Sequence, residues 1–305
     1  MKEKKLVFKK VKKKYFTFIK KQEILGEPFY NKLKQLNFFY LPICDYIFKK
    51  FKNSQKTFII GLSGGQGSGK STIAQIIKII LKTKYNLNVV NFSIDDYYKT
   101  SEERIKLSKI YSKLFITRGV PGTHDTKLLM SHIKKLKRKN FKQFSIPKFD
   151  KSIDDRMKKK NWVKIKKKPQ IIIFEGWCVG ARPQSNNSLN KPINRLEKYY
   201  DVDLTWRKKV NNELKKKYNN IFRLLNILIY LKVPNFKSVL KWRILQEKKL
   251  KIKSKGKKVM NEFQIKKFIM YYERITKNMM KDLGKNSNIV IRLDQKHRLH
   301  SLKFN

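Results

Sequence analysis

Cysteine is scarce in this sequence. Cys44 and Cys178 are the only two among 305 residues, which is too few for a disulfide framework, and they lack the spacing of a metal site. The N-terminal stretch MKEKKLVFKKVKKKYF has no continuous apolar core, so it lacks the pattern of a secretory signal. These absences predict a protein of a reducing compartment, the cytoplasm.

Long apolar runs are absent as well. No run approaches the ~20 apolar residues that a membrane-spanning helix needs. The most apolar late stretch, residues 221–231, is short and is interrupted by Arg223. The sequence therefore predicts no membrane partner.

Acidic residues are few compared with basic ones. The chain has 22 Asp and Glu against 75 Lys and Arg, which gives a net charge of +53. Such a charge by itself suggests a nucleic-acid or anionic-membrane partner. However, the basic residues are mostly lysines spread along the whole chain, without an aromatic-interleaved stripe or a compact arginine patch. We interpret the charge as a compositional bias and expect no specific nucleic-acid partner, only a salt-dependent attraction for polyanions.

The most informative stretch follows an apolar strand that ends at Leu62. It reads GGQGSGKS and fits the P-loop pattern G-x-x-x-x-G-K-[ST] without a mismatch. Its glycines allow the backbone to curl until successive N–H groups face phosphate oxygens. Lys70 then reaches the β- and γ-phosphates, and Ser71 offers its hydroxyl to Mg²⁺. The predicted ATP-binding residues are Gly64, Gly65, Gln66, Gly67, Ser68, Gly69, Lys70, Ser71 and Thr72.

Carboxylates follow two further apolar strands. Asp95 and Asp96 come just after the strand at 89–93, and Glu175 ends the all-apolar strand that begins at residue 170. Because the carboxyl ends of parallel strands line one crevice, these side chains should face the bound phosphates. An acid in the position of Glu175 can hold Mg²⁺ directly or through water. The alternative for Glu175 is a surface carboxylate at a strand end.

Two polar loops should face the acceptor, residues 118–125 and 146–156. The second is too polar for a core and has no amphipathic period, so we predict a loop without regular structure. Asp125 either caps the helix that follows or binds substrate, and these roles are compatible. A carboxylate-bearing acceptor would suit the guanidinium and ammonium groups of these loops. Arg118 is the first candidate to clamp that carboxylate, and a structural salt bridge to Asp125 or Asp150 is the alternative. A nucleoside would instead suit their aromatic neighbours Tyr97, Phe149 and Trp177.

In the remaining parts of the chain, the sequence predicts helices and connections around the sheet. Residues 184–200 contain Asn, Ser and Pro, and we expect an exposed connection there. The basic helix that starts near residue 236 should be interrupted at 255–256 and return through a second helix from 261 to about 283. A helix, basic turn and helix between two late strands is a usual place for a lid, although a solvated helical hairpin is the alternative. Residues 1–55 form a lysine-rich helical leader, broken by Pro28 and Pro42, that we interpret as a packing cap.

Eight segments in this order carry a resemblance to a known family. They are GLSGGQGSGKST, SIDDYY, RGVPGTHD, IPKFDKS, IIIFEGWCVGARP, VNNELKKKY, KVPNFKSVLKWRILQE and IVIRLD. The sequence resembles the D-glycerate 3-kinases of plants and cyanobacteria and their yeast relatives, P-loop kinases related to uridine kinase, phosphoribulokinase and pantothenate kinase. The resemblance runs from about residue 38 to the end, and RGVPGTHD together with FEGWCVGARP is its most specific part.

The resemblance implies roles for individual residues. Asp95 matches the general base toward the acceptor hydroxyl, and Asp96 would orient Mg²⁺ or the acceptor. Glu175 matches the acid of the FEG strand, which with Ser71 and Asp96 makes the candidate metal ligands. Arg243 lies in the basic arm that covers the phosphates and joins Lys70 and Asp95 as the candidate catalytic residues. The candidate substrate-binding residues are Asp96, Tyr98, Arg118, His124, Asp125, Lys148, Lys151 and Arg156.

One departure from the family pattern concerns the acceptor. The loop after Lys151 and Ser152 reaches Asp155 and Arg156 with almost nothing between, whereas relatives often have a longer, glycine-rich loop. Since this loop should touch the acceptor, its shortening leaves the identity of the acceptor open. The prediction of phosphoryl transfer does not depend on this loop.

These observations predict an α/β protein of the P-loop NTPase type. Its three-layer sandwich should have a mainly parallel central sheet, a helical lid at about 240–262 and an N-terminal helical extension. Residues 1–55 would be the extension and residues 56–305 the kinase domain. The expected activity is ATP- and Mg²⁺-dependent phosphorylation of a small hydroxy acid, D-glycerate to 3-phosphoglycerate. The alternatives are a kinase of a nucleoside, a sugar phosphate, pantothenate or another metabolite, and a nucleic-acid-binding ATPase; the oligomeric state stays open.

Overall fold

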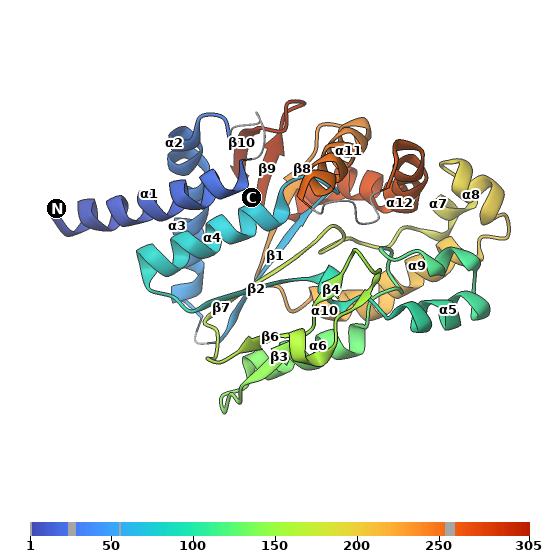
Figure 1. Cartoon of the computed structure of the whole chain (residues 1–305), viewed down its shortest axis with the longest axis horizontal. Helices are drawn as coiled ribbons and strands as arrows, with labels where there is room; N and C mark the ends of the chain where they lie inside the picture. The colour runs from blue at the N-terminus through green and yellow to red at the C-terminus, as the bar shows by residue number, and fades with distance from the viewer. Residues whose placement is uncertain (1, 24–28, 55, 254–259) are drawn as a thin grey trace.

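The computed structural model describes residues 2–23, 29–54, 56–253 and 260–305 of the chain. Within them a six-stranded sheet forms the middle of the molecule, in the order β10-β9-β8-β1-β7-β2 (Figure 1). Neighbouring strands are parallel except for β9 and β10, so the predicted mainly parallel sheet is confirmed. The strands are β1 (Phe58–Gly64), β2 (Val89–Ser93), β7 (Ile171–Gly176), β8 (Ile227–Lys232), β9 (Ile289–Leu293) and β10 (Leu299–Phe304).

Helices cover both faces of this sheet. The α-helices are α1 (Lys2–Gln22), α2 (Lys32–Gln35), α3 (Leu41–Lys52), α4 (Lys70–Tyr85), α5 (Ser101–Ile110), α6 (Thr126–Lys137), α7 (Asn186–Asn190), α8 (Arg195–Tyr200), α9 (Thr205–Glu213), α10 (Asn219–Phe222), α11 (Phe236–Lys253) and α12 (Glu262–Asn286). Shorter 3₁₀ or π turns are η1 (Leu36–Tyr40), η2 (Ile94–Tyr97), η3 (Lys113–Ile116), η4 (Lys159–Asn161) and η5 (Leu214–Tyr218).

The side chains of β7 show how the layers form. Ile171 and Ile173 pack into the core cluster of α1, α3 and α4, whereas Ile172 and Phe174 pack into the cluster of α6 and α9. Successive residues of a strand point to opposite faces, so each face receives every second side chain. Because both faces are covered, β1 and β7 are buried throughout and read as continuous apolar runs. The predicted three-layer α/β sandwich is confirmed.

The carboxyl ends of three strands meet at one edge of the sheet. Glu175 of β7 lies in register with Leu62 of β1 on one side and with Ser93 of β2 on the other. The P-loop follows β1, and η2, which carries Asp95, follows β2. Parallel pairing therefore brings together residues from three distant segments, as the sequence analysis expected.

The N-terminal helices pack on the α4 side of the sheet. α1 buries Val11, Tyr15 and Ile19, four residues apart, in the core cluster that contains α4. The prediction that Pro42 breaks a helix is wrong. Helical backbone continues from α2 through η1 into α3, and Pro42 follows directly after the π turn, where the shifted hydrogen bonds accommodate a residue without an N–H. Pro28 lies outside the described residues.

The predicted exposure of residues 184–200 is confirmed for most of their side chains, but the prediction missed two short helices and a buried carboxylate. This segment contains α7 and α8, and Glu197 of α8 is fully buried. Its carboxylate lies 2.6 Å from an Arg274 nitrogen of α12 and 3.4 Å from one of Arg207 of α9. The polar composition was misleading for Glu197, because a charged side chain is buried when arginines from other helices pair with it.

The predicted loop at 146–156 carries regular structure, so that prediction is wrong as well. β4 (Phe149–Asp150) pairs with β5 (Asp155–Arg156) in a tight antiparallel hairpin, beside a second small pair, β3 (Phe144–Ile146) with β6 (Val163–Ile165). The hairpin turn includes Asp154 with φ of 58°, a left-handed conformation that Asp tolerates better than most residues. The shortened loop is thus the turn of a paired hairpin.

The two helices of the expected lid are α11 and α12, which lie beside each other (Figure 1). The expected interruption at 255–256 falls outside the described residues. Both cysteines are buried and unpaired. Among the described residues, none of the helices has the length and apolar character needed to cross a membrane.

Candidate functional site

The P-loop is curled around an open set of polar atoms. Gly67 and Gly69 have φ of 73° and 86°, values that favour glycine. Lys70, the first residue of α4, donates from Nζ to the Gly65 carbonyl at 2.9 Å. In the described part of the chain, the buried side-chain polar atoms of Ser63, Gln66 and Ser68 find no hydrogen-bond partner. Buried polar groups are normally paired, so these atoms fit a loop that takes up a polar ligand such as phosphate.

Ser71 and Glu175 form the part of the site that fits Mg²⁺. Ser71 Oγ donates to Glu175 Oε1 at 2.7 Å. Burial raises the pKa of Glu175, while Lys70 and the Ser71 hydrogen bond oppose that rise. No group of three or more His, Cys, Asp or Glu side chains that could hold a metal occurs in the described ranges. Mg²⁺ typically needs only one or two protein oxygens beside water and substrate phosphates, so the pair suffices.

Asp96, the third candidate metal ligand, is engaged by other groups. Its carboxylate accepts from Lys148 Nζ at 3.0 and 3.2 Å and from the backbone N–H of Ser93 at 3.1 Å. Burial raises the pKa of Asp96, and Lys148 opposes the rise. The structure thus joins Asp96 to Lys148, another predicted site residue, and gives it a role in capping η2.

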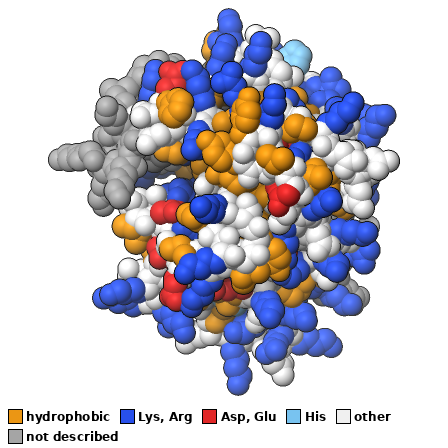
Figure 2. Space-filling model, turned by 90° about the vertical axis from the view of Figure 1, so that its right-hand side faces the viewer, with side chains coloured by type: hydrophobic (Ala, Val, Ile, Leu, Met, Phe, Trp, Pro, Cys, Tyr) orange, Lys and Arg blue, Asp and Glu red, His pale blue; other side chains and the backbone are white. Residues whose placement is uncertain are grey.

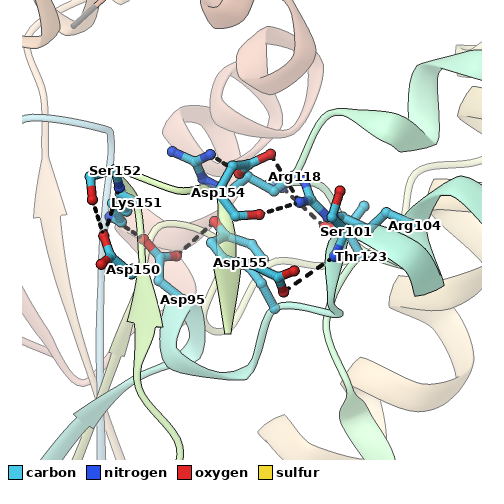
Figure 3. A network of polar contacts seen from close by, with 12 residues as sticks. Asp95, Ser101, Arg104, Arg118, Thr123, Asp150, Lys151, Ser152, Asp154 and Asp155 are labelled. Carbon is cyan, nitrogen blue, oxygen red and sulfur yellow. Dashed lines mark hydrogen bonds and ion pairs between the residues drawn. The ribbon is translucent and has the colours of Figure 1, made fainter. Parts of the chain in front are cut away.

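Asp95 is held by one cation and one hydroxyl. Lys151 Nζ donates to Asp95 Oδ2 at 2.8 Å, and Tyr98 donates to Oδ1 at 2.9 Å. Burial alone would raise the pKa of Asp95, but Lys151 and the Tyr98 hydrogen bond hold it well below its usual range. Asp95 is therefore an ionised carboxylate, the charge state of a base. Figure 3 shows Lys151 reaching it from the turn after β4.

Arg118 is paired within the protein. Its guanidinium forms a salt bridge with Asp154, which also accepts from Arg104 Nη2 at 2.9 Å (Figure 3). The sequence analysis weighed an acceptor clamp against a salt bridge to Asp125 or Asp150. The structure has the salt bridge but with Asp154, because the left-handed hairpin turn points that carboxylate toward both arginines.

We expect Arg118→Lys to lower the free energy of unfolding by about 1 kcal/mol, since lysine lacks the planar guanidinium that pairs with the half-exposed Asp154 and lies over the Phe149 ring. Arg182→Lys is the matched control, because Arg182 is largely exposed and lies 3.7 Å from Asp282. Denaturant melts of both variants measure the difference. An unchanged melt with a raised KM for the acceptor would instead assign Arg118 to the acceptor clamp.

Arg156 and Asp125 hold loops together. Arg156 donates to the Tyr98 carbonyl at 2.8 and 3.2 Å and lies 3.6 Å from Asp125. Asp125 accepts from the Leu128 N–H at 3.0 Å, so its predicted helix-capping role is confirmed. Its substrate-binding role stays a proposal.

Four aromatic or imidazole rings connect Asp95 with the loop at 118–124. Tyr98 stacks on His124 with ring centroids 4.5 Å apart, and His124 Nδ1 lies 2.6 Å from the Tyr218 hydroxyl. Tyr272 of α12 donates to the Arg118 carbonyl at 3.1 Å. The sequence analysis missed Tyr218 and Tyr272, because both lie on apolar helix faces and read as core. A tyrosine on such a face still needs a partner for its hydroxyl, and that was the available signal.

Arg243 is turned toward its own helix. It is buried, forms a salt bridge with Glu247 and donates to Gln246 at 2.8 Å. Its neighbour Trp242 lies against the P-loop, since a Cβ on Gly67 would be 2.9 Å from Trp242 backbone carbon. α11 is therefore next to the phosphate loop, while the two terminal nitrogens of Arg243 are engaged by Gln246 and Glu247.

Basic side chains are dispersed over the surface. Figure 2 shows lysines and arginines spread around the face that carries α5 and α8, interleaved with apolar side chains. The face drawn there has no compact basic band.

Several known proteins that are similar to this chain in sequence or in fold are named as kinases. "Uncharacterized kinase mug58" of Schizosaccharomyces pombe is 34% identical over 239 residues, which are 75% of this chain and 83% of the relative. The chloroplastic D-glycerate 3-kinase of Arabidopsis thaliana is 25% identical over 233 residues, 73% of this chain and 48% of the relative. The solved D-glycerate 3-kinase of Cryptococcus neoformans shares the fold, with a TM-score of 0.73, 21% identity, and coverage of 87% of this chain and 99% of that one.

The family match covers the elements that build the site. Residues 59–211 match the family described as "Phosphoribulokinase / Uridine kinase family". That range includes the P-loop, Asp95, the acceptor-side loops and Glu175. This chain belongs to the phosphoribulokinase and uridine kinase family of P-loop kinases.

Proposed function

We propose that this kinase transfers the γ-phosphoryl group of ATP to a hydroxyl of a small hydroxy acid, with D-glycerate as the first candidate and 3-phosphoglycerate as the product. Similarity to the Arabidopsis D-glycerate 3-kinase over most of the chain supports this choice. The observation that carries it is a pair of half-exposed lysines on the two carboxylates after β2. Lys148 and Lys151 have 46% and 53% of their side chains exposed.

These lysines suit an acceptor with its own negative charge. Each of these ammonium groups has three N–H donors, so a substrate carboxylate can share one lysine with Asp95 or Asp96 while the substrate hydroxyl approaches Asp95. Each carboxylate then keeps a cation, and none is buried without a partner. A neutral nucleoside has no charge to pair with these lysines.

The donor side uses the P-loop and the strand ends. Lys70 would move from the Gly65 carbonyl to the β- and γ-phosphates, and the loop N–H groups from 64 to 69 would surround them. Ser71 and Glu175 would hold Mg²⁺, and the chemistry supplied there is neutralisation of phosphate charge. Asp95 accepts the hydroxyl proton as the oxygen attacks, and α11 with Arg243 acts as a lid that completes the charge clamp. Residues 1–55 form an extension to the kinase domain at 56–305.

A panel of acceptors tests the proposal. D-glycerate, uridine, pantothenate and ribulose 5-phosphate are offered separately with Mg-ATP while ADP release is followed. We expect D-glycerate to give the highest kcat/KM. Faster turnover of one of the others would assign another acceptor on the same fold. ADP release that responds only to RNA would contradict a small-molecule acceptor.

A further inference from the structure

His124 occupies an unusual position beside the candidate base. Its side chain is 1% exposed and lies between Tyr98, which stacks on the ring, and Tyr218 of η5. Tyr98 in turn donates to Asp95. The imidazole is thus one ring away from the carboxylate at which the acceptor hydroxyl should react.

The hydrogen bonds of Tyr218 determine which His124 nitrogen carries the proton. The Gly122 N–H donates to the Tyr218 oxygen at 3.1 Å, and the same oxygen lies 2.6 Å from His124 Nδ1. A phenol has one proton to give, and in this fully buried position Nδ1 is its partner. Nδ1 therefore accepts, and the ring proton must sit on Nε2. Burial lowers the pKa of His124 to about 3, so the ring is neutral at physiological pH.

Nε2 is then a buried donor without a partner. Within the part of the chain that the structure describes, no acceptor lies within hydrogen-bond reach of this atom. The two nitrogens of an imidazole point in widely different directions, so Nε2 faces away from Tyr218. The charge of Asp95 also acts on the pKa of His124, against the effect of burial, because the two groups are close. An unpaired buried N–H next to a reactive carboxylate requires an explanation.

We propose that Tyr218 fixes His124 as a neutral Nε2–H donor and that this donor hydrogen-bonds an oxygen atom of the acceptor substrate beside Asp95. His124 is then a specificity-determining residue and Tyr218 a positioning residue. The inference rests on the proposed function, because it takes Asp95 as the residue at which the acceptor hydroxyl reacts. It adds that the acceptor presents a hydroxyl, carbonyl or carboxylate oxygen to Nε2. A substrate with an ammonium group facing Nε2 would be rejected, since an ammonium has no lone pair with which to accept the hydrogen bond.

A second histidine provides a matched control. His132 is 4% exposed, its Nδ1 lies 3.1 Å from the Tyr97 hydroxyl, and its ring packs on Phe144 and Trp162 in the core. It shares the histidine–tyrosine pairing without stacking on the tyrosine that holds Asp95. Replacing His132 should affect stability without an acceptor-specific effect.

The protonation pattern is tested in the ligand-free protein by long-range ¹H–¹⁵N correlation spectra. The chain has only four histidines, and His124→Gln and His132→Gln assign the two buried ones. We expect His124 to stay neutral with the proton on Nε2 from pH 6 to pH 8. Tyr218→Phe should produce a mixture of both neutral forms. A proton on Nδ1, or an imidazolium ring, in the wild type overturns the proposal whatever the substrate is.

Kinetics test the donation to the acceptor. With D-glycerate we expect His124→Leu to raise the acceptor KM about tenfold, to leave the KM for ATP unchanged, and to be partly rescued by His124→Gln, whose amide can donate. 3-Hydroxypropionate, which lacks the 2-hydroxyl, distinguishes the two oxygens. If the defect disappears with this analogue, the bond goes to the 2-hydroxyl, and if it persists, the bond goes to the carboxylate or the 3-hydroxyl.

Failure of the inference and failure of the proposed function give different results. If wild-type protein does not turn over D-glycerate, the proposed acceptor is wrong, and the same variants are compared with the acceptor that the panel identifies. An unchanged acceptor KM in His124→Leu, or an equal rise in His132→Leu, overturns the inference. If His124→Leu fails to fold, Tyr218→Phe takes its place, with the same expected rise in the acceptor KM and the tautomer shift as its spectroscopic signature.

Discussion

Lys70→Ala is expected to reduce kcat by ~10²-fold or more while the protein stays folded. The lysine serves the transferred phosphoryl group, whose negative charge needs a fixed cation in the transition state. In the described part of the chain, its ammonium donates to the Gly65 carbonyl of the P-loop itself, so its loss removes no hydrogen bond of the core. ADP release with saturating acceptor measures the effect, and a thermal melt checks the fold.

Lys82→Ala is the matched control for Lys70→Ala. Lys82 belongs to the same helix, α4, but lies on its exposed face. We expect wild-type rates from this variant. Full activity in Lys70→Ala would remove the P-loop from the mechanism, and an equal loss in both variants would indicate a general effect of net charge.

Asp95→Asn is expected to lower kcat by roughly 10² to 10⁴-fold with ATP binding nearly intact. Asparagine keeps the shape and still accepts from Tyr98, but it cannot take the proton of the acceptor hydroxyl. Glu175→Gln should first weaken the dependence on Mg²⁺, because its partner Ser71 is the other candidate ligand. Equal loss of ATP affinity in the two variants would mean that Asp95 is a metal ligand and that the base lies elsewhere.

Asp45→Asn controls for the loss of a carboxylate. Asp45 also accepts from a lysine and a tyrosine, Lys84 at 2.6 Å and Tyr85 at 2.5 Å, but it lies on the exposed side of α3. Its replacement should leave kcat unchanged. A similar loss of rate in both variants would contradict the assignment of the base to Asp95.

The pH profile gives a second readout for Asp95. Since Lys151 holds the pKa of this carboxyl below its usual range, Asp95 stays ionised well into acid, and the rate should not fall as the pH drops from 7 to 5. Lys151→Met removes the cation, and burial then raises the pKa of Asp95. The variant should lose activity as the pH falls through the new, higher pKa, where protonation removes the base.

The site was predicted unevenly from the sequence. The strand, curled loop and helix of the P-loop were predicted, because its glycines act through consecutive backbone positions. Asp95 and Glu175 were predicted because each follows an apolar strand, and parallel strands align their carboxyl ends. By contrast, the partners of these groups were not predicted. Seventy-five basic residues offer many equivalent cations, and no local pattern selects Lys151 for Asp95 or Asp154 for Arg118.

The errors in the fold have a related cause. Residues 184–200 are mostly exposed, as their polar composition suggested, yet they form α7 and α8, and Glu197 is buried between Arg207 and Arg274 of two other helices. The stretch 146–156 looked irregular because each strand of its hairpin is only two residues long. Both features depend on contacts that a periodicity of apolar residues does not record.

The sequence by itself determined the elements whose signal is local: the strand, P-loop and helix around Lys70, the parallel sheet, and the carboxylates at its edge. Only the tertiary structure decided how the acceptor side is assembled, with Lys151 on Asp95, Arg118 on Asp154, and Tyr218 behind His124. The physical reason is that a phosphate-binding loop uses the backbone of consecutive residues, whereas charge pairs and buried hydrogen bonds join side chains from distant segments. Their partners are chosen by distance and burial, and these exist only once the sheet and its helices have packed.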